Sequence, residues 1–348
     1  MSKAKGRSAQ HVKAVNLALQ GGGAHGAFTW GVLDKIFEDG RIWVEAISGT
    51  SAGAMNAVVA AQGMYDGGGV GARECLHNFW RQVSEASRTS PIQRGIWDRF
   101  MGNWSLDHSP GFVMMDLMTR VASPYVLNPL NINPLRDLVE EYVDFQKVRD
   151  CADMPIYLSA TNVETGRVRV FSREEVTLDV TMASACLPFL FQAVLIDGVP
   201  YWDGGYMGNP VLFPFFSDSP CDDIVIVQIN PVVRPGVPRT APEIMNRINE
   251  ITFNASLLRE LRAIDFVHRL ISEDKLDGGD YRDMKLHIIH SRKKMRSLGA
   301  SSKLNAEWEF LLHLRDIGRS AAARWIDDHF DDIGVHSTVD LREMFASQ

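Results

Sequence analysis

Buried strands and amphipathic helices are predicted to alternate along the first part of the chain. Residues 14–19 (AVNLAL) and 42–47 are short hydrophobic runs with the length of buried strands. Between them, residues 27–38 carry apolar side chains at helical spacing, and Asp39-Gly40 ends this helix. The small, apolar residues of 54–62 suit a second helix that packs closely on a sheet. This order predicts an α/β fold with a central, mostly parallel sheet flanked by helices.

Further along, two segments interrupt this pattern. Residues 63–71 (GMYDGGGVG) predict a flexible connection, because glycine-rich segments are poor helix formers. Residues 91–134 are rich in Met and aromatic residues, among them Trp97 and Phe100, and are broken by prolines, so we interpret them as a cap or insertion. We expect strands at 156–162, 167–171, 199–202, 224–230 and 286–290, and helices at 75–84, 135–143, 181–187, 243–272 and 304–330.

These elements suggest three parts of unequal length. Residues 1–13 form a polar tail whose basic residues are followed by no apolar run, so we expect no signal peptide. We expect residues 14–230 to form one α/β domain, the part of the chain that carries the motifs described below. Residues 231–348 begin with a proline-rich linker and continue as a mainly helical C-terminal extension. The terminal helix, 304–330, has the pattern of a packing or dimer helix, so a homo-oligomer stays open.

Composition restricts the classes of partner. The chain has 348 residues and a net charge of −7, from 36 Lys and Arg against 43 Asp and Glu, and we therefore expect no nucleic-acid partner. Its four cysteines form no CxxC pair, which argues against a zinc site and favours a reducing compartment. No apolar stretch is long enough to cross a bilayer. We expect a cytoplasmic protein, with at most a peripheral association with a membrane or lipid granule.

The strongest chemical motif is Gly49-x-Ser51-x-Gly53, which falls where the second strand turns into a helix. A nucleophilic serine needs a sharp turn that exposes its hydroxyl, and the flanking glycines avoid clashes with neighbouring backbone. The helix amino terminus behind Ser51 adds positive partial charge where an oxyanion would develop. The alternative interpretation of the motif is an ordinary helix cap.

A glycine-rich loop, Gln20-Gly21-Gly22-Gly23-Ala24-His25-Gly26, joins the first strand to its helix. Its exposed backbone amides favour negative charge. Gly21-x-Gly23-x-x-Gly26 formally matches a dinucleotide fingerprint, with Glu45 near the position of the ribose-binding acid. The second strand, however, continues into the Ser51 turn, which favours an oxyanion hole for acyl transfer instead.

Asp203-Gly204-Gly205 follows a short strand and supplies a candidate base. Only one strand and one helix precede Ser51, which does not fit the usual α/β-hydrolase order of serine, acid and histidine. Among the ten histidines only His25 lies in a glycine-rich turn, and it belongs to the loop already described. A carboxylate can itself act as the base when burial raises its pKa toward neutral pH. An ordinary Asp-Gly turn is the alternative for Asp203 taken alone.

The three motifs, in this order and spacing, resemble the patatin-like phospholipase family. Residues 183–188 (ASACLP) and Asn209-Pro210 also resemble its pattern, and the match covers about residues 14–230. The resemblance implies a three-layer α/β/α fold and a Ser–Asp dyad in place of a triad. It implies Ser51 as the nucleophile, Asp203 as the proton acceptor, and Gly21, Gly22 and Gly23 as the oxyanion hole, with Gly26, Gly49, Gly53, Gly204 and Gly205 as motif glycines.

The resemblance also implies a reaction: hydrolysis of lipid acyl esters through an acyl-enzyme, of the phospholipase A or lysophospholipase type, without metal or organic cofactor. The chain departs from the family at two loop positions, with His25 where an Arg is usual and Gln20 where an Asp is frequent. Ester hydrolysis is therefore better supported than contact with a phosphate headgroup. A dinucleotide-binding protein and a catalytically silent lipid-binding protein are the alternatives.

Overall fold

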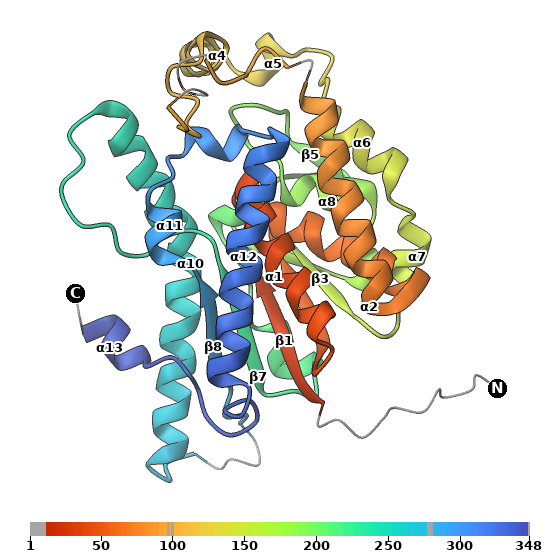
Figure 1. The fold of residues 1–348 in the computed structure, drawn as a ribbon, viewed down its shortest axis with the longest axis vertical. Coiled ribbons are helices and arrows are strands. Elements are labelled where there is room, and N and C mark those ends of the chain that lie inside the picture. Colours follow the sequence, from red (N-terminus) through yellow and green to blue (C-terminus); the bar gives the residue numbers. More distant parts are fainter. Residues whose placement is uncertain (1–11, 89, 96–97, 99–100, 277–280, 347–348) are drawn as a thin grey trace.

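An eight-stranded mixed sheet organises the chain (Figure 1). The computed structural model describes residues 12–88, 90–95, 98, 101–276 and 281–346. The strands lie in the order β5-β6-β3-β2-β1-β7-β8, and β4 pairs with β3 beside this path. The four pairings that join β3, β2, β1, β7 and β8 are parallel, whereas β4, β5 and β6 pair antiparallel. The strands are β1 (Lys13–Leu19), β2 (Ile42–Gly49), β3 (Ile156–Asn162), β4 (Val168–Ser172), β5 (Val194–Ile196), β6 (Val199–Asp203), β7 (Asp223–Gln228) and β8 (Lys285–His290).

Helices cover both faces of this sheet. The α-helices are α1 (Gly26–Asp39), α2 (Ala52–Ser87), α4 (Pro110–Val121), α5 (Pro124–Leu127), α6 (Pro134–Tyr142), α7 (Phe145–Asp150), α8 (Leu178–Ser184), α9 (Pro214–Asp218), α10 (Ala241–Ser272), α11 (Arg292–Arg296), α12 (Trp308–His329) and α13 (Leu341–Ala346). Four 3₁₀ turns complete the described elements: η1 (Gly23–His25), η2 (Arg173–Glu175), η3 (Gly204–Tyr206) and η4 (Ser301–Leu304).

Side chains of β1 show how the two faces are filled. Val15, Leu17 and Leu19 belong to a core shared with α1, α2 and α12, whereas Ala18 belongs to a second core shared with α10. The predicted α/β fold with a mostly parallel sheet between helical layers is thereby confirmed. β8 and α12 come from the last third of the chain, so that part contributes both a strand and a covering helix.

The pairing of β3 brings two distant segments together. β2 and β4 lie on opposite sides of β3, because both pair with Leu158. β6 also lies opposite β4, because both pair with Ala160, so β6 occupies the same side of β3 as β2. Gly49, the last residue of β2, pairs with Leu158, and Asp203, the last residue of β6, pairs with Ala160. The two strands therefore end facing each other, two residues apart along β3.

Residues 63–71 differ from the predicted flexible connection. They lie within α2, which is broken only at Gly67 and Gly68, where the backbone leaves helical geometry. Gly63 packs against the backbone of Gly71, and a Cβ at either position would overlap the carbonyl of the other. Gly63 and Gly71 thus permit a close contact between the two halves of α2, because without side chains the two helical turns can touch.

The predicted cap, 91–134, contains α4 and α5, which lie beyond the end of the sheet toward which β1 runs (Figure 1). No side chain of α4 is buried. Trp97 and Phe100, and residues 1–11 of the predicted tail, lie outside the described residues. Among the residues that are described, no helix combines the length and hydrophobicity needed to span a membrane.

Glycines let α12 lie against α1. A Cβ at Gly318 would overlap the carbonyl oxygen of Phe28, and one at Gly31 would overlap the carbonyl of Arg315.

We expect Gly318→Val to lower the free energy of unfolding by about 2–4 kcal/mol, because the branched side chain forces the helices apart in a closely packed core. Denaturant titration measures this change. Arg324→Val, on the exposed face of the same helix, is the control and should change stability by less than about 0.5 kcal/mol; equal effects of both variants would contradict the close helix contact.

Candidate active site

Ser51 occupies a strained turn at the end of β2. Its φ of 54° and ψ of −118° are unusual for a residue with a side chain, and α2 begins at the next residue. The flanking glycines permit the turn: a Cβ at Gly49 would lie 2.6 Å from the carbonyl oxygen of Gly53, and a Cβ at Gly53 would overlap the backbone of Leu19. The predicted turn between strand and helix is therefore present, and it holds the Ser51 side chain at the carboxyl edge of the sheet.

Asp203 lies at the end of β6 and is fully buried. Its Oδ1 accepts a hydrogen bond of 2.7 Å from the amide of Gly205. Its Oδ2 is buried and makes no hydrogen bond of standard geometry within the described residues. The Ser51 hydroxyl is nevertheless near enough to stabilise the ionised carboxyl, since it lowers the pKa of Asp203. The structure thus brings the two predicted residues, 152 positions apart in the sequence, together.

Burial controls the protonation of Asp203. It raises the pKa of this carboxyl to about 6, against the opposing effects of the Gly205 amide, the Ser51 hydroxyl and the Lys303 ammonium. A carboxyl with this pKa is mostly ionised at pH 7 and yet holds a proton far better than an exposed aspartate. Both properties are needed in a group that accepts a proton and later returns it.

A single short segment holds both residues. The amide of Ser51 donates a hydrogen bond of 2.9 Å to the Ser184 hydroxyl at the end of α8. The amide of Asp203 donates to the carbonyl of Cys186, at 2.8 Å. Both acceptors belong to the ASACLP segment noted in the sequence, so this segment connects the backbone of the turn to that of β6.

The glycine-rich loop lies directly beside Ser51. A Cβ at Gly21 would lie 2.7 Å from the Cβ of Ser51, so only glycine permits this contact. The amide of Gly21, however, donates a 2.6 Å hydrogen bond to Oδ1 of Asn209 and is thereby engaged. The amides of Gly22 and Gly23 have no acceptor among the described residues. Of the three glycines predicted as oxyanion donors, Gly21 therefore has its amide engaged, and Gly22 and Gly23 remain the candidates.

Buried amide side chains fix the loop, and the sequence did not reveal them. Oε1 of Gln20 accepts hydrogen bonds from the amides of Ile229 and Asn230, both at 2.9 Å. Nε2 of Gln20 donates to Asn254, and Nδ2 of Asn230 donates to the carbonyl of Gly21 at 2.8 Å. Gln20, at a position where an Asp is frequent in similar loops, thus binds the loop to β7 and α10.

His25, the histidine of the glycine-rich loop, is not placed to act as a base for Ser51. Its Nε2 hydrogen-bonds the Ser302 hydroxyl at 2.8 Å, and burial together with the charge of Lys303 lowers its pKa to about 3. It is therefore neutral at pH 7. Among the histidines within the described ranges, none hydrogen-bonds Ser51 or Asp203. Among all residues that the structure describes, no group of three or more His, Cys, Asp or Glu side chains could hold a metal ion.

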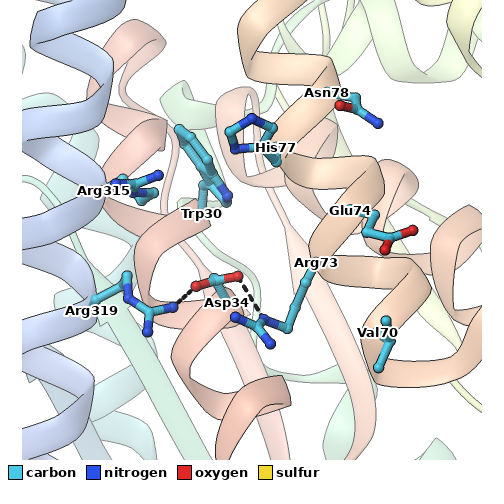
Figure 2. A pocket seen from close by; sticks show the side chains of 9 residues that line it. All are labelled: Trp30, Asp34, Val70, Arg73, Glu74, His77, Asn78, Arg315 and Arg319. Atoms are coloured by element: carbon cyan, nitrogen blue, oxygen red, sulfur yellow. Dashed lines mark hydrogen bonds and ion pairs between the residues drawn. The ribbon is translucent and has the colours of Figure 1, made fainter.

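A hollow of about 670 Å³ lies between α1, α2 and α12, away from Ser51 and Asp203 (Figure 2). Asp34 is paired there with Arg73 and Arg319, and Trp30 and His77 form another part of the lining. Neither Ser51 nor Asp203 lines this hollow. Because its central carboxylate is already satisfied by two arginines, we assign it a structural role in joining the three helices.

Comparison with known proteins gives one family and several distant structures. The sequence model of the patatin-like phospholipase family matches residues 17–216. A search of curated proteins found no match. VipD from Legionella pneumophila has 16% sequence identity and a TM-score of 0.37, over 89% of this chain and 67% of VipD. ExoU in its complex with SpcU, from the type III secretion system of Pseudomonas aeruginosa, has 16% identity and a TM-score of 0.32, over 96% of this chain and 65% of ExoU. A further crystal structure of the type III effector protein ExoU has 13% identity and a TM-score of 0.33, over 89% of this chain and 53% of ExoU.

Replacement of the buried Asp203 carboxyl by a neutral group should make the folded protein more stable at neutral pH. The folded-state pKa of about 6 exceeds the value of about 3.9 for an unfolded aspartate, so ionisation costs stability as pH rises between these values. We expect the free energy of unfolding of Asp203→Asn to exceed that of the wild type by about 1–3 kcal/mol at pH 7.5. Urea titrations at pH 4.5 and 7.5 measure both proteins. The gain should fall to about a third of its size at the lower pH, which lies just above the unfolded pKa, and it should be absent from the exposed control Asp153→Asn. A variant less stable than wild type at pH 7.5 would contradict the buried charge.

Proposed function

Because the chain belongs to the patatin-like phospholipase family, we propose that it hydrolyses carboxylic esters of lipids through a dyad of Ser51 and Asp203. Membership of this family implies lipid acyl hydrolase activity, and its members are typically serine hydrolases. The dyad, the ester substrate and the residues of the oxyanion hole are our proposal for this chain. One observation supports it most: a strained, positive-φ serine lies beside a buried aspartate whose pKa is about 6.

The arrangement supports acyl transfer in two steps. Ser51 Oγ attacks the ester carbonyl carbon while Asp203 takes the hydroxyl proton, and the carbonyl electron pair moves to its oxygen. Collapse of this intermediate breaks the bond to the alcohol, which leaves with the proton from Asp203. A water then gives its proton to Asp203 and attacks the acyl-enzyme. The second collapse releases the fatty acid and returns the proton to Ser51.

Two sets of backbone dipoles would stabilise the oxyanion. The unengaged amides of Gly22 and Gly23 lie on the loop that contacts Ser51. The amino terminus of α2 begins at Ala52 and directs positive partial charge toward the same turn. Pre-aligned donors of this kind contribute about 3–4 kcal/mol each to acyl transfer in enzymes that use them. Neither set needs to rearrange, because each is held by the fold.

The surface formed by α4 and α5 suits a lipid. Exposed apolar side chains cover both helices, with more than half of Val113, Met114, Leu117 and Val126 accessible. The only charged residues of α4, Asp116 and Arg120, pair with each other. The Tyr125 hydroxyl and the carbonyl of Asn128 hydrogen-bond the loop before β5, which leads into β6 and Asp203. We propose that this surface contacts the acyl chains of the substrate or the lipid phase that contains it.

The dinucleotide alternative receives less support from the loop. Gly21 contacts Ser51, and its amide already donates to Asn209, so this amide is not available to bind a pyrophosphate. Glu45 lies within β2 and not at its end, because the strand continues to Gly49. Titration with NAD or NADP, followed by tryptophan fluorescence, tests this alternative. The hydrolase proposal expects no saturable change.

Loss of the Ser51 hydroxyl should abolish hydrolysis. We expect Ser51→Ala to lower the rate with p-nitrophenyl acyl esters by at least about 10³-fold, because the nucleophile is absent while the fold is retained. The wild-type kcat/KM should also fall below about pH 6, as Asp203 takes up a proton. Steady-state kinetics from pH 5 to 8 measure both effects, with circular dichroism as the test of folding.

Two controls make this result specific. Ser217→Ala removes an exposed serine, and His108→Ala removes an exposed histidine, and both should keep wild-type activity. Full activity of Ser51→Ala would refute the nucleophile assignment. A wild-type protein that resists a fluorophosphonate probe and hydrolyses no ester would support the silent lipid-binding alternative instead.

A further inference from the structure

Lys303 brings a positive charge from the C-terminal third of the chain to the proposed dyad. It lies in η4, whose backbone packs against the glycine-rich loop: a Cβ at Gly23 would lie 2.5 Å from the carbonyl oxygen of Lys303. The preceding residue, Ser302, hydrogen-bonds His25 of the same loop. η4 therefore lies beside the loop, although about 280 residues separate them in the sequence.

The Lys303 ammonium contacts an amide side chain and an aromatic ring. Its Nζ donates a 2.9 Å hydrogen bond to Oδ1 of Asn230, and it lies 5.5 Å from the centre of the Phe253 ring. No carboxylate within the described residues lies at ion-pair distance from it. The nearby Glu250 is paired with Arg234 and Arg247. Lys303 is partly buried. A charge that is partly withdrawn from water without a paired anion loses hydration, and such charges are enriched at functional sites.

The neighbours of Asp203 single out Lys303 as the charge that acts on it. Burial raises the pKa of both the Cys186 thiol and the Tyr206 phenol to about 12, so these groups and the Ser51 hydroxyl are neutral at pH 7. Burial lowers the pKa of Lys303 to about 8, which leaves it mostly protonated at pH 7. Around Lys303 itself, His25 is neutral, and the Glu250 carboxylate and Arg234 guanidinium oppose each other in their effect.

We propose that Lys303 is the positioning cation of the acyl-transfer site: together with the Gly205 amide and the Ser51 hydroxyl it favours the ionised form of Asp203, and it balances the negative charge that passes to the oxyanion. The inference rests on the proposed function. As Ser51 attacks, its proton neutralises Asp203 while an electron pair moves to the carbonyl oxygen, so the site carries one negative charge before and after the step. A fixed cation beside both the aspartate and the glycine loop stabilises this charge throughout.

This assignment explains the histidine of the loop. His25 occupies the position where an Arg is usual in similar loops, yet it is buried, neutral and bonded to Ser302. Lys303, the residue after Ser302, supplies the positive charge that the loop itself lacks. Asn230 connects the two, because its Oδ1 accepts from Lys303 and its Nδ2 donates to the carbonyl of Gly21. The C-terminal third thus completes the site.

The test is the pH dependence of fluorophosphonate labelling of Ser51, measured on the full-length chain by mass spectrometry. We expect the wild-type labelling rate to fall as the pH is lowered, with a midpoint near pH 6 where Asp203 takes up a proton. Lys303→Met should move the midpoint up by about one pH unit, because the carboxyl loses the cation that favours its ionised form. Lys303→Arg, which retains the positive charge, should keep the wild-type midpoint. The exposed control Lys293→Met should also leave the midpoint unchanged. Lys303→Gln, which keeps a hydrogen-bond donor without the charge, serves if the Met variant fails to fold.

The outcomes separate this inference from the function on which it rests. Failure of the wild-type protein to be labelled at Ser51 would overturn the proposed function itself. A labelled wild type, together with a folded Lys303→Met or Lys303→Gln variant that keeps the midpoint near pH 6, would overturn only the role of Lys303. A uniform loss of rate at every pH, without a shifted midpoint, would likewise assign Lys303 a purely structural role.

Discussion

The end-to-end meeting of β2 and β6 on one side of β3 is the constraint on which the site depends. Strand pairing sets it, because Gly49 and Asp203 pair with β3 residues only two positions apart. A slip of one residue in either register would turn the side chains to the other face of the sheet and separate the serine from the carboxyl. The glycines at this junction follow from the same constraint. A Cβ at Gly204 would overlap Ser159 of β3, and one at Gly21 would press on Ser51, so the close approach of three backbone segments excludes side chains there.

The site combines two features that cost stability. Ser51 has a positive φ, and Asp203 is a buried carboxyl with one oxygen that, among the residues the structure describes, lacks a hydrogen-bond partner of standard geometry. The surrounding hydrogen bonds maintain both: Ser184 holds the turn, and Gly205 and Cys186 hold the aspartate. Burial that disfavours the charged form is the same property that raises the pKa of Asp203 toward neutral pH. The energetic cost and the proposed chemistry therefore have one physical origin.

Local patterns predicted the elements well, because strands and helices follow from hydrophobic spacing. The Ser51 turn and the Asp203 turn were also predictable, since each needs glycines beside one reactive residue. The family match confirms the resemblance drawn from these motifs. One prediction was wrong for a tertiary reason: residues 63–71 lie within α2, where Gly63 and Gly71 permit a close contact between helical turns. The hydrogen bond from the Gly21 amide to Asn209 was likewise not indicated by any local pattern. The roles of Asn230 and Lys303 had no local signal, because a single Asn or Lys far along the chain acquires a role only when folding brings it to the loop.

The central claim is that Ser51, Asp203 and the amides of Gly22 and Gly23 surround one reacting carbonyl. A crystal structure of the protein after reaction with a fluorophosphonate tests this most directly, because the phosphonyl oxygen occupies the place of the oxyanion. The account predicts a covalent bond to Ser51 Oγ, with the phosphonyl oxygen within hydrogen-bond distance of the two glycine amides and Asp203 beside the serine. An adduct on another residue, or a phosphonyl oxygen directed away from both amides, would contradict it.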